Sequence, residues 1–84
     1  MTANSIRTLV VDDEALARRG ICARLATAPD FEVVGECSGG RMAVDSIRSL
    51  APDLVFLDVQ MPEVDGFDVI DSVGADRMPL AIFL

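Results

Sequence analysis

Two apolar runs that end abruptly in acidic residues restrict the fold of this chain more than any other feature. Ile6 to Val11 reads IRTLVV and is followed by three acids that begin at Asp12. Leu54 to Leu57 reads LVFL and runs directly into Asp58. Apolar runs of this length, rich in β-branched residues, predict strands. Strands that lack apolar–polar alternation are typical of parallel sheets that are covered on both faces.

The rest of the chain predicts an alternation of strands with helices. Two further strands are expected at Phe31 to Cys37 and at Leu80 to Leu84. Helical periodicity predicts three helices, over Glu14 to Ala26, Arg41 to Leu50, and Gly66 to about Val73. A β-α-β-α-β-α-β order implies an α/β fold with a parallel sheet and right-handed crossovers. At 84 residues the chain has room for one domain, residues 1–84.

The first predicted helix has an apolar stripe at Ala17, Ile21 and Leu25. We expect this stripe to face the sheet and the nearby arginines, Arg18 among them, to face solvent. The acid Asp13 is the expected N-cap of this helix.

The other two helices each show a shorter apolar face. In the second helix the residues expected to face the sheet are Ala43, Ile47 and Leu50. In the third helix they are Phe67 and Ile70.

Composition excludes several classes of function. The net charge of −7 disfavours binding of nucleic acid or of an anionic membrane by this chain. No apolar stretch reaches the roughly 20 residues of a membrane-spanning helix. The segment Met1 to Ser5 is short and polar, so we expect no signal peptide and a cytoplasmic location.

The two cysteines give no sign of a metal site. Cys22 and Cys37 lie 15 residues apart, and the sequence contains no histidine and no CxxC motif. This disfavours zinc and favours two small buried apolar residues in a reducing compartment.

The acids at the strand ends carry the chemical prediction. If the first and third strands are neighbours, their carboxyl ends share one edge of the sheet, and Asp12, Asp13 and Asp58 lie close together. Carboxylates so placed repel one another unless a cation lies between them. Mg²⁺ prefers such oxygen ligands, and an aspartate beside it can act as a nucleophile toward a phosphoryl group.

The strings VVDDE at positions 10–14 and FLDVQMPEVDG at 56–66 resemble the CheY-like receiver domains of two-component response regulators. The resemblance implies that Asp58 accepts a phosphoryl group and is also a metal ligand. It further implies that Asp12, Asp13 and the backbone carbonyl of Gln60 bind the same Mg²⁺. A sensor histidine kinase or a phosphotransfer protein is the implied partner.

The resemblance also implies a flavodoxin-like doubly wound sheet, with its four predicted strands in the order 2-1-3-4. In that family a hydroxyl residue follows the fourth strand and a lysine follows a fifth strand. This sequence stops at Leu84 and contains no lysine. We therefore expect a truncated, incomplete receiver domain that binds Mg²⁺ weakly, is phosphorylated slowly and is impaired as a switch. A fourth strand at the edge of the sheet predicts a homodimer or higher oligomer.

Other interpretations of the same residues remain open. A pair of acids after a strand is commonly a helix cap, and MPEVDG alone is a turn. The chain could instead be a non-phosphorylated interaction module that homo-oligomerises. A haloacid-dehalogenase-type phosphatase is disfavoured, because such enzymes carry DxD after the first strand whereas this chain has adjacent acids. We expect no enzyme activity.

Overall fold

The computed structural model describes residues 4–84, which form a four-stranded parallel sheet and three helices. The strands are β1 (Ile6–Val11), β2 (Phe31–Cys37), β3 (Leu54–Leu57) and β4 (Leu80–Phe83). The helices are α1 (Ala15–Ala26), α2 (Gly40–Leu50) and α3 (Gly66–Val73). The strand order is β2-β1-β3-β4, so the predicted fold class and strand order are confirmed. Residues 1–3 of the polar N-terminal segment lie outside the described residues.

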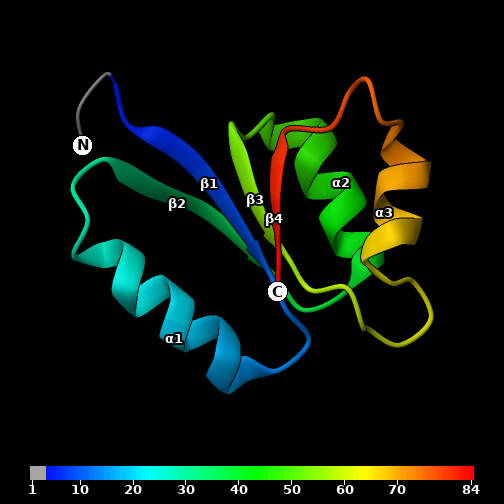
Figure 1. Ribbon diagram of the computed structural model, residues 1–84, viewed down its shortest axis with the longest axis horizontal. Helices are drawn as coiled ribbons and strands as arrows, with labels where there is room; N and C mark the ends of the chain where they lie inside the picture. The colour runs from blue at the N-terminus through cyan, green and yellow to red at the C-terminus, as the bar shows by residue number, and fades with distance from the viewer. Residues whose placement is uncertain (1–3) are drawn as a thin grey trace.

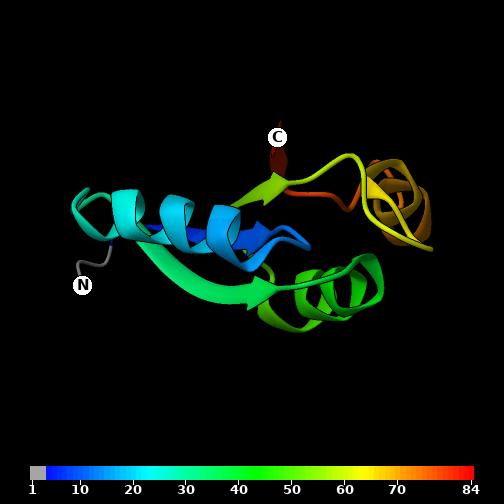
Figure 2. The same ribbon diagram turned by 90° about the horizontal axis from the view of Figure 1, so that it is seen from below.

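The sheet separates the helices into two layers. Figure 1 shows α1 on one side of the strands and α2 together with α3 on the other, and Figure 2 shows the same arrangement from below. This three-layer arrangement explains the apolar character of the central strands, because both of their faces are covered. No helix within residues 4–84 is long and apolar enough to cross a membrane.

The main core lies between the sheet and the α2–α3 layer. It combines Leu9 and Val11 of β1 with Val55 and Leu57 of β3, all fully buried. Val10 is also fully buried but lies outside this cluster, since alternate residues of a strand point to opposite faces. Both faces of β1 are therefore covered near its carboxyl end.

Helix α2 faces the core largely as predicted. Ala43 and Ile47 are buried and Leu50 is half-buried. The helix begins at Gly40, one residue earlier than expected. A Cβ atom on Gly40 would overlap the backbone carbonyl of Val64, so glycine lets the start of α2 approach the loop before α3.

The predicted inner stripe of α1 is only partly correct. Ile21 is half-buried and Leu25 is buried, but Ala17 is exposed and Arg18 is half-buried. The helix is thus turned about its axis toward the side of Arg18, by less than the roughly 100° that separates neighbouring residues. A hydrogen bond accounts for this rotation, since Arg18 Nη1 donates to the backbone carbonyl of Asp12 over 2.8 Å.

The predicted inner face of α3 is also partly wrong. Phe67 is 57% exposed and Ile70 is half-buried, whereas Val69 and Val73 are buried. Gly66 is buried at the start of the helix, and positions three and seven residues later lie on the same side. Phe67 therefore points outward, where its ring lies 5.8 Å from the ring of Phe83.

The cysteines differ in their surroundings. Cys37 is buried, and its thiol donates a hydrogen bond to Ser46 Oγ over 3.4 Å. Cys22 is only half-buried, so the expectation of two buried cysteines holds for Cys37 alone. Both thiols are free.

Strand β4 forms one edge of the sheet and is largely exposed. It pairs only with β3 among the described strands. Leu80 is 72% exposed, and Ile82 and Phe83 are exposed as well. The predicted edge position of this strand is confirmed.

The rotation of α3 can be tested with two substitutions on the same helix. Val69→Ala should lower the free energy of unfolding by about 2 kcal/mol, because it removes two buried methyl groups and leaves a cavity. Phe67→Ala should lower it by about 1 kcal/mol or less, because the ring is mostly in water. Urea titrations followed by far-UV circular dichroism measure both; a larger loss for Phe67→Ala would contradict the orientation of α3.

Candidate functional site

The carboxyl ends of β1 and β3 lie side by side at one edge of the sheet. Val11 and Leu57 are register partners, and the amide of Asp58 donates to the carbonyl of Val11 over 3.0 Å. The residues that follow the two strands, Asp12 and Asp58, are therefore brought to the same place. In an open parallel sheet this is the edge where ligands bind.

Three carboxylates meet at this edge. Asp12, Asp13 and Asp58 each offer an oxygen atom, and these atoms lie within 4.8 Å of one another. Asp12 is buried at 6% exposure, Asp58 is half-buried and Asp13 is exposed. The structure thus unites the three acids that the sequence singled out.

The carboxylate of Asp12 is held by the turn between β1 and α1. Its Oδ1 accepts a hydrogen bond from the amide of Glu14 over 2.9 Å, and its own amide donates to the carbonyl of Cys37. The N-cap residue of α1 is Glu14, which makes no side-chain capping bond. The predicted N-cap role of Asp13 is therefore wrong. The carboxylate that accepts from the amide of Glu14 is that of Asp12, and the side chain of Asp13 lies against Asp58.

Asp58 is oriented by the chain that follows it. Its Oδ1 accepts a hydrogen bond from the amide of Gln60 over 3.0 Å. Burial raises the pKa of the Asp58 carboxyl above 3.8, the nearby Asp12 and Asp13 carboxyls raise it further, and the Gln60 amide opposes the shift. The structure therefore places Gln60 against Asp58 through its amide nitrogen.

The donor set suits a small, hard divalent cation. All three side chains offer carboxylate oxygens, which Mg²⁺ prefers, and the cluster contains no nitrogen or sulfur ligand. Two of the carboxylates are at least half-buried, so their mutual repulsion is less screened than at an open surface. These residues fit such an ion.

Arg18 also supports the site, although its side chain was expected to face solvent. Besides its bond to the Asp12 carbonyl, its Nε lies 3.3 Å from Glu36 Oε1 of β2. Arg18 thus ties the turn that carries Asp12 to both α1 and β2. Its spacing to Leu25, seven residues later on the same side of the helix, was the signal available in the sequence.

The loop from Asp58 to α3 depends on a close approach at Gly66. A Cβ atom there would lie 2.7 Å from the backbone carbonyl oxygen of Asp58, so no other residue fits without a shift. Helix α3 is capped beside it, because Asp65 and Asp68 form a reciprocal capping box. Glu63 adopts a φ of 67°, an uncommon conformation for a residue with a side chain.

Comparison with known proteins places this architecture in a family. The profile of the response regulator receiver domain matches residues 8–84. The chain belongs to this family. The expected resemblance is thereby confirmed, and the chain is a receiver domain of the two-component response regulators.

Curated relatives share this domain within longer proteins. The receiver domain is 38% identical over 79 residues to the transcriptional regulatory protein BtsR of Salmonella typhi, and the match covers 94% of this chain and 33% of BtsR. It is 40% identical over 79 residues to protein-glutamate methylesterase/protein-glutamine glutaminase 1 of Methanosarcina mazei, covering 93% of this chain and 22% of that protein. The receiver domain therefore spans a third or less of these two relatives.

Solved structures agree with the fold. The response regulator domain of Thermotoga maritima CheB superposes with a TM-score of 0.86 at 32% identity, covering 94% of this chain and 59% of that one. The signal receiver domain of the putative response regulator NarL of Mycobacterium tuberculosis gives the same TM-score and identity, covering 95% of this chain and 65% of that one. The fold of the receiver domain is thus that of its family.

Repulsion within the acidic cluster should make Asp58 destabilising at neutral pH without divalent cations. Its pKa is raised in the folded state, so the folded state binds a proton more readily than the unfolded state as the pH falls. Asp58→Asn should therefore raise the free energy of unfolding at pH 7 in EDTA, and this gain should disappear below about pH 3.8, where Asp58 is protonated in both states.

The measurement is a pair of urea titrations of each protein, one at each pH. Asp71→Asn, on the exposed surface of α3, is the matched control and should show a smaller change at neutral pH. Equal stabilities of the wild type and Asp58→Asn at pH 7 would refute the claim of repulsion.

Proposed function

We propose that this receiver domain accepts a phosphoryl group on Asp58. The observation that carries the proposal is the meeting of Asp12, Asp13 and Asp58 at the carboxyl ends of β1 and β3. Membership in the receiver family supports it, since the function of a domain is argued from its site within the fold.

The reaction is a phosphoryl transfer to a carboxylate. A carboxylate oxygen of Asp58 attacks the phosphorus atom of the donor, a new O–P bond forms, and the bond from phosphorus to the donor breaks. With acetyl phosphate as donor, acetate leaves with the bonding electron pair. The Gln60 amide holds Asp58 Oδ1, which leaves the second oxygen of the carboxylate for the attack.

The same residues would hold Mg²⁺. We propose as ligands the carboxylates of Asp12, Asp13 and Asp58, together with the backbone carbonyl of Gln60. A bound Mg²⁺ supplies positive charge that offsets the charge of the phosphoryl group and of the acids around it. Arg18 and the Glu14 amide contribute by fixing the turn that presents Asp12.

The partners follow from this chemistry. We propose a sensor histidine kinase or a phosphotransfer protein as the donor, in the cytoplasm, with no contact to nucleic acid through this acidic domain. The relatives are a transcriptional regulator and a methylesterase/glutaminase, so domains of this family accompany different activities. We propose no enzyme activity for residues 1–84.

Phosphorylation can be tested on the chain as it is. Acetyl phosphate with Mg²⁺ should add one phosphoryl group, seen by intact-protein mass spectrometry, and borohydride reduction followed by peptide mapping should locate it at Asp58. We expect slower loading than for a lysine-containing receiver domain assayed beside it, because these 84 residues include no lysine to contact the phosphoryl group. In parallel, Mg²⁺ should raise the thermal midpoint of unfolding.

Matched variants separate the site from the rest of the acidic surface. Asp58→Asn should abolish labelling, and Asp13→Asn should reduce the effect of Mg²⁺ on the thermal midpoint. Asp71→Asn, exposed on α3, should change neither. Labelling that persists in Asp58→Asn, or no response of the wild type to either Mg²⁺ or acetyl phosphate, would overturn the proposal.

A second candidate function is favoured by the exposed edge at β4. Leu80, Ile82 and Phe83 are 72%, 44% and 47% exposed, and β4 leaves backbone groups on its outer side without a partner strand among the described residues. Such an edge can pair with another chain. We propose that the 84-residue chain associates with itself through β4, as an interaction module that needs no phosphorylation.

Light scattering across a range of concentrations tests this association. The wild type should form dimers or larger species, and Ile82→Lys should shift it toward the monomer, because a charge on the edge strand opposes edge-to-edge pairing. Leu16→Lys, at an exposed apolar position on α1, is the control and should leave the association unchanged. A wild type that stays monomeric at high concentration would exclude this function.

A further inference from the structure

A cleft lies at the amino ends of β3 and β4, whereas the acidic cluster lies at the carboxyl ends of the strands. It has a volume of about 450 Å³ and lies between the end of α2 and the segment that joins α3 to β4. Pro52 and Pro79 lie in its walls just before β3 and β4 begin, whereas Asp58 follows β3. The cleft is thus separated from the acidic cluster by the length of β3.

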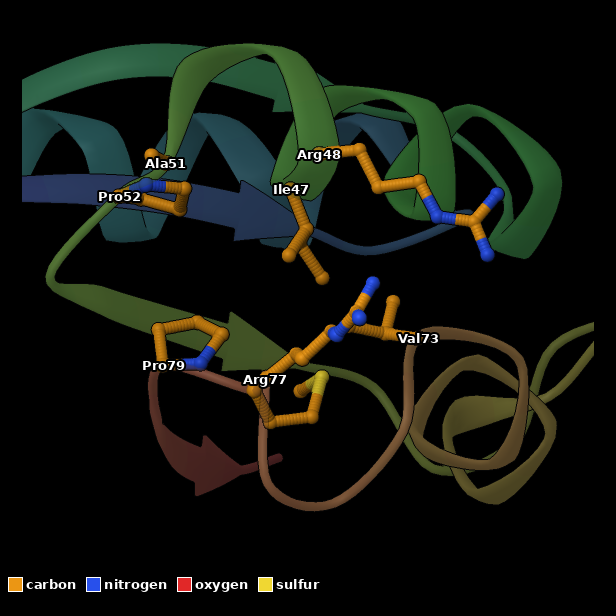
Figure 3. A pocket seen from close by; sticks show the side chains of 8 residues that line it. Ile47, Arg48, Ala51, Pro52, Val73, Arg77 and Pro79 are labelled. Atoms are coloured by element: carbon orange, nitrogen blue, oxygen red, sulfur yellow. The ribbon is translucent and has the colours of Figure 1, made fainter.

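The walls of the cleft are mostly apolar. Ile47 of α2 and Val73 of α3 are buried residues of the core that face it, and Met78 is half-buried. In Figure 3, Pro52 and Pro79 stand on opposite sides. The volume lies within the roughly 300–1,000 Å³ of small-molecule sites, which combine apolar walls with a few polar groups.

The only charged residues among those that line the cleft are two arginines. Arg48 comes from α2 and Arg77 from the segment before β4, and no aspartate or glutamate lines the cleft. This is unusual for a chain with 14 acidic residues and a net charge of −7. The charged residues at the cleft are therefore positive on a molecule that is otherwise acidic, and positive charge favours an anion.

The two arginines differ in their hydrogen-bond partners. Arg48 Nη2 donates to the backbone carbonyl of Ser72 over 2.8 Å, so its guanidinium is held between α2 and α3. The side chain of Arg77 forms no hydrogen bond or ion pair with the residues that the structure describes. Figure 3 shows the Arg77 guanidinium reaching across the cleft toward Ile47. Arg77 is exposed, so its donors are open to solvent or to a ligand.

We propose that this cleft binds a small carboxylate with an apolar body, its carboxylate on Arg77 and its apolar part against Ile47, Val73 and Met78. A planar guanidinium pairs well with a carboxylate through two parallel hydrogen bonds. The proposal does not depend on phosphorylation of Asp58, since it uses other residues at the opposite edge of the sheet.

The test uses octanoate as the probe, with octanol and octylamine as neutral and cationic probes of the same length. Titration of the ¹⁵N-labelled chain by NMR should show octanoate shifting the amides of Ile47, Val73 and Met78 in a saturable way. Octanol should bind about tenfold more weakly, because it lacks the charge-assisted hydrogen bonds to Arg77, and octylamine should not bind.

Variants at the arginine complete the test. Arg77→Met should weaken octanoate binding about tenfold, and Arg77→Lys should restore part of it. Arg19→Met removes an exposed arginine of α1 outside the cleft and should leave binding unchanged. Octanoate shifts that are absent, that are matched by octanol, or that survive Arg77→Met would each overturn the proposal.

Discussion

The parallel pairing of β1 with β3 is the constraint on which the rest of the molecule depends. The two strands share a register from Thr8 with Leu54 to Val11 with Leu57, so they end together. This pairing forces the acids that follow both strands onto one edge, and it buries the strands between two layers of helices. The apolar strand interiors and the acidic strand ends are therefore two results of one geometry.

Bringing three carboxylates together works against stability, and the surrounding contacts show how the fold tolerates it. The amides of Glu14 and Gln60 each donate to one of the acids, and Arg18 donates to the backbone carbonyl of Asp12. These bonds orient the acids but leave most of their charge uncompensated. An acidic cluster held in this way supports the proposed site for a divalent cation.

Much of the fold and of the acidic cluster could be predicted from the sequence, because runs such as LVFL report strand type and burial directly. The faces of α1 and α3 were harder, because several residues of each helix could form an apolar stripe. Contacts between each helix and the loop before it made the choice: Arg18 with the Asp12 carbonyl, and Gly66 with the Asp58 carbonyl. The cleft escaped prediction for the same reason, since Arg48 and Arg77 line one cleft only after α2 and α3 pack together.

The close approach at Gly66 has a mechanical consequence. No side chain lies between Gly66 and the carbonyl of Asp58, so the first turn of α3 rests directly on the backbone of that residue. The other end of the helix, at Val73, forms part of the wall of the arginine-lined cleft. A helix of eight residues is only about 12 Å long. One short element therefore touches both the acidic cluster and the arginine-lined cleft.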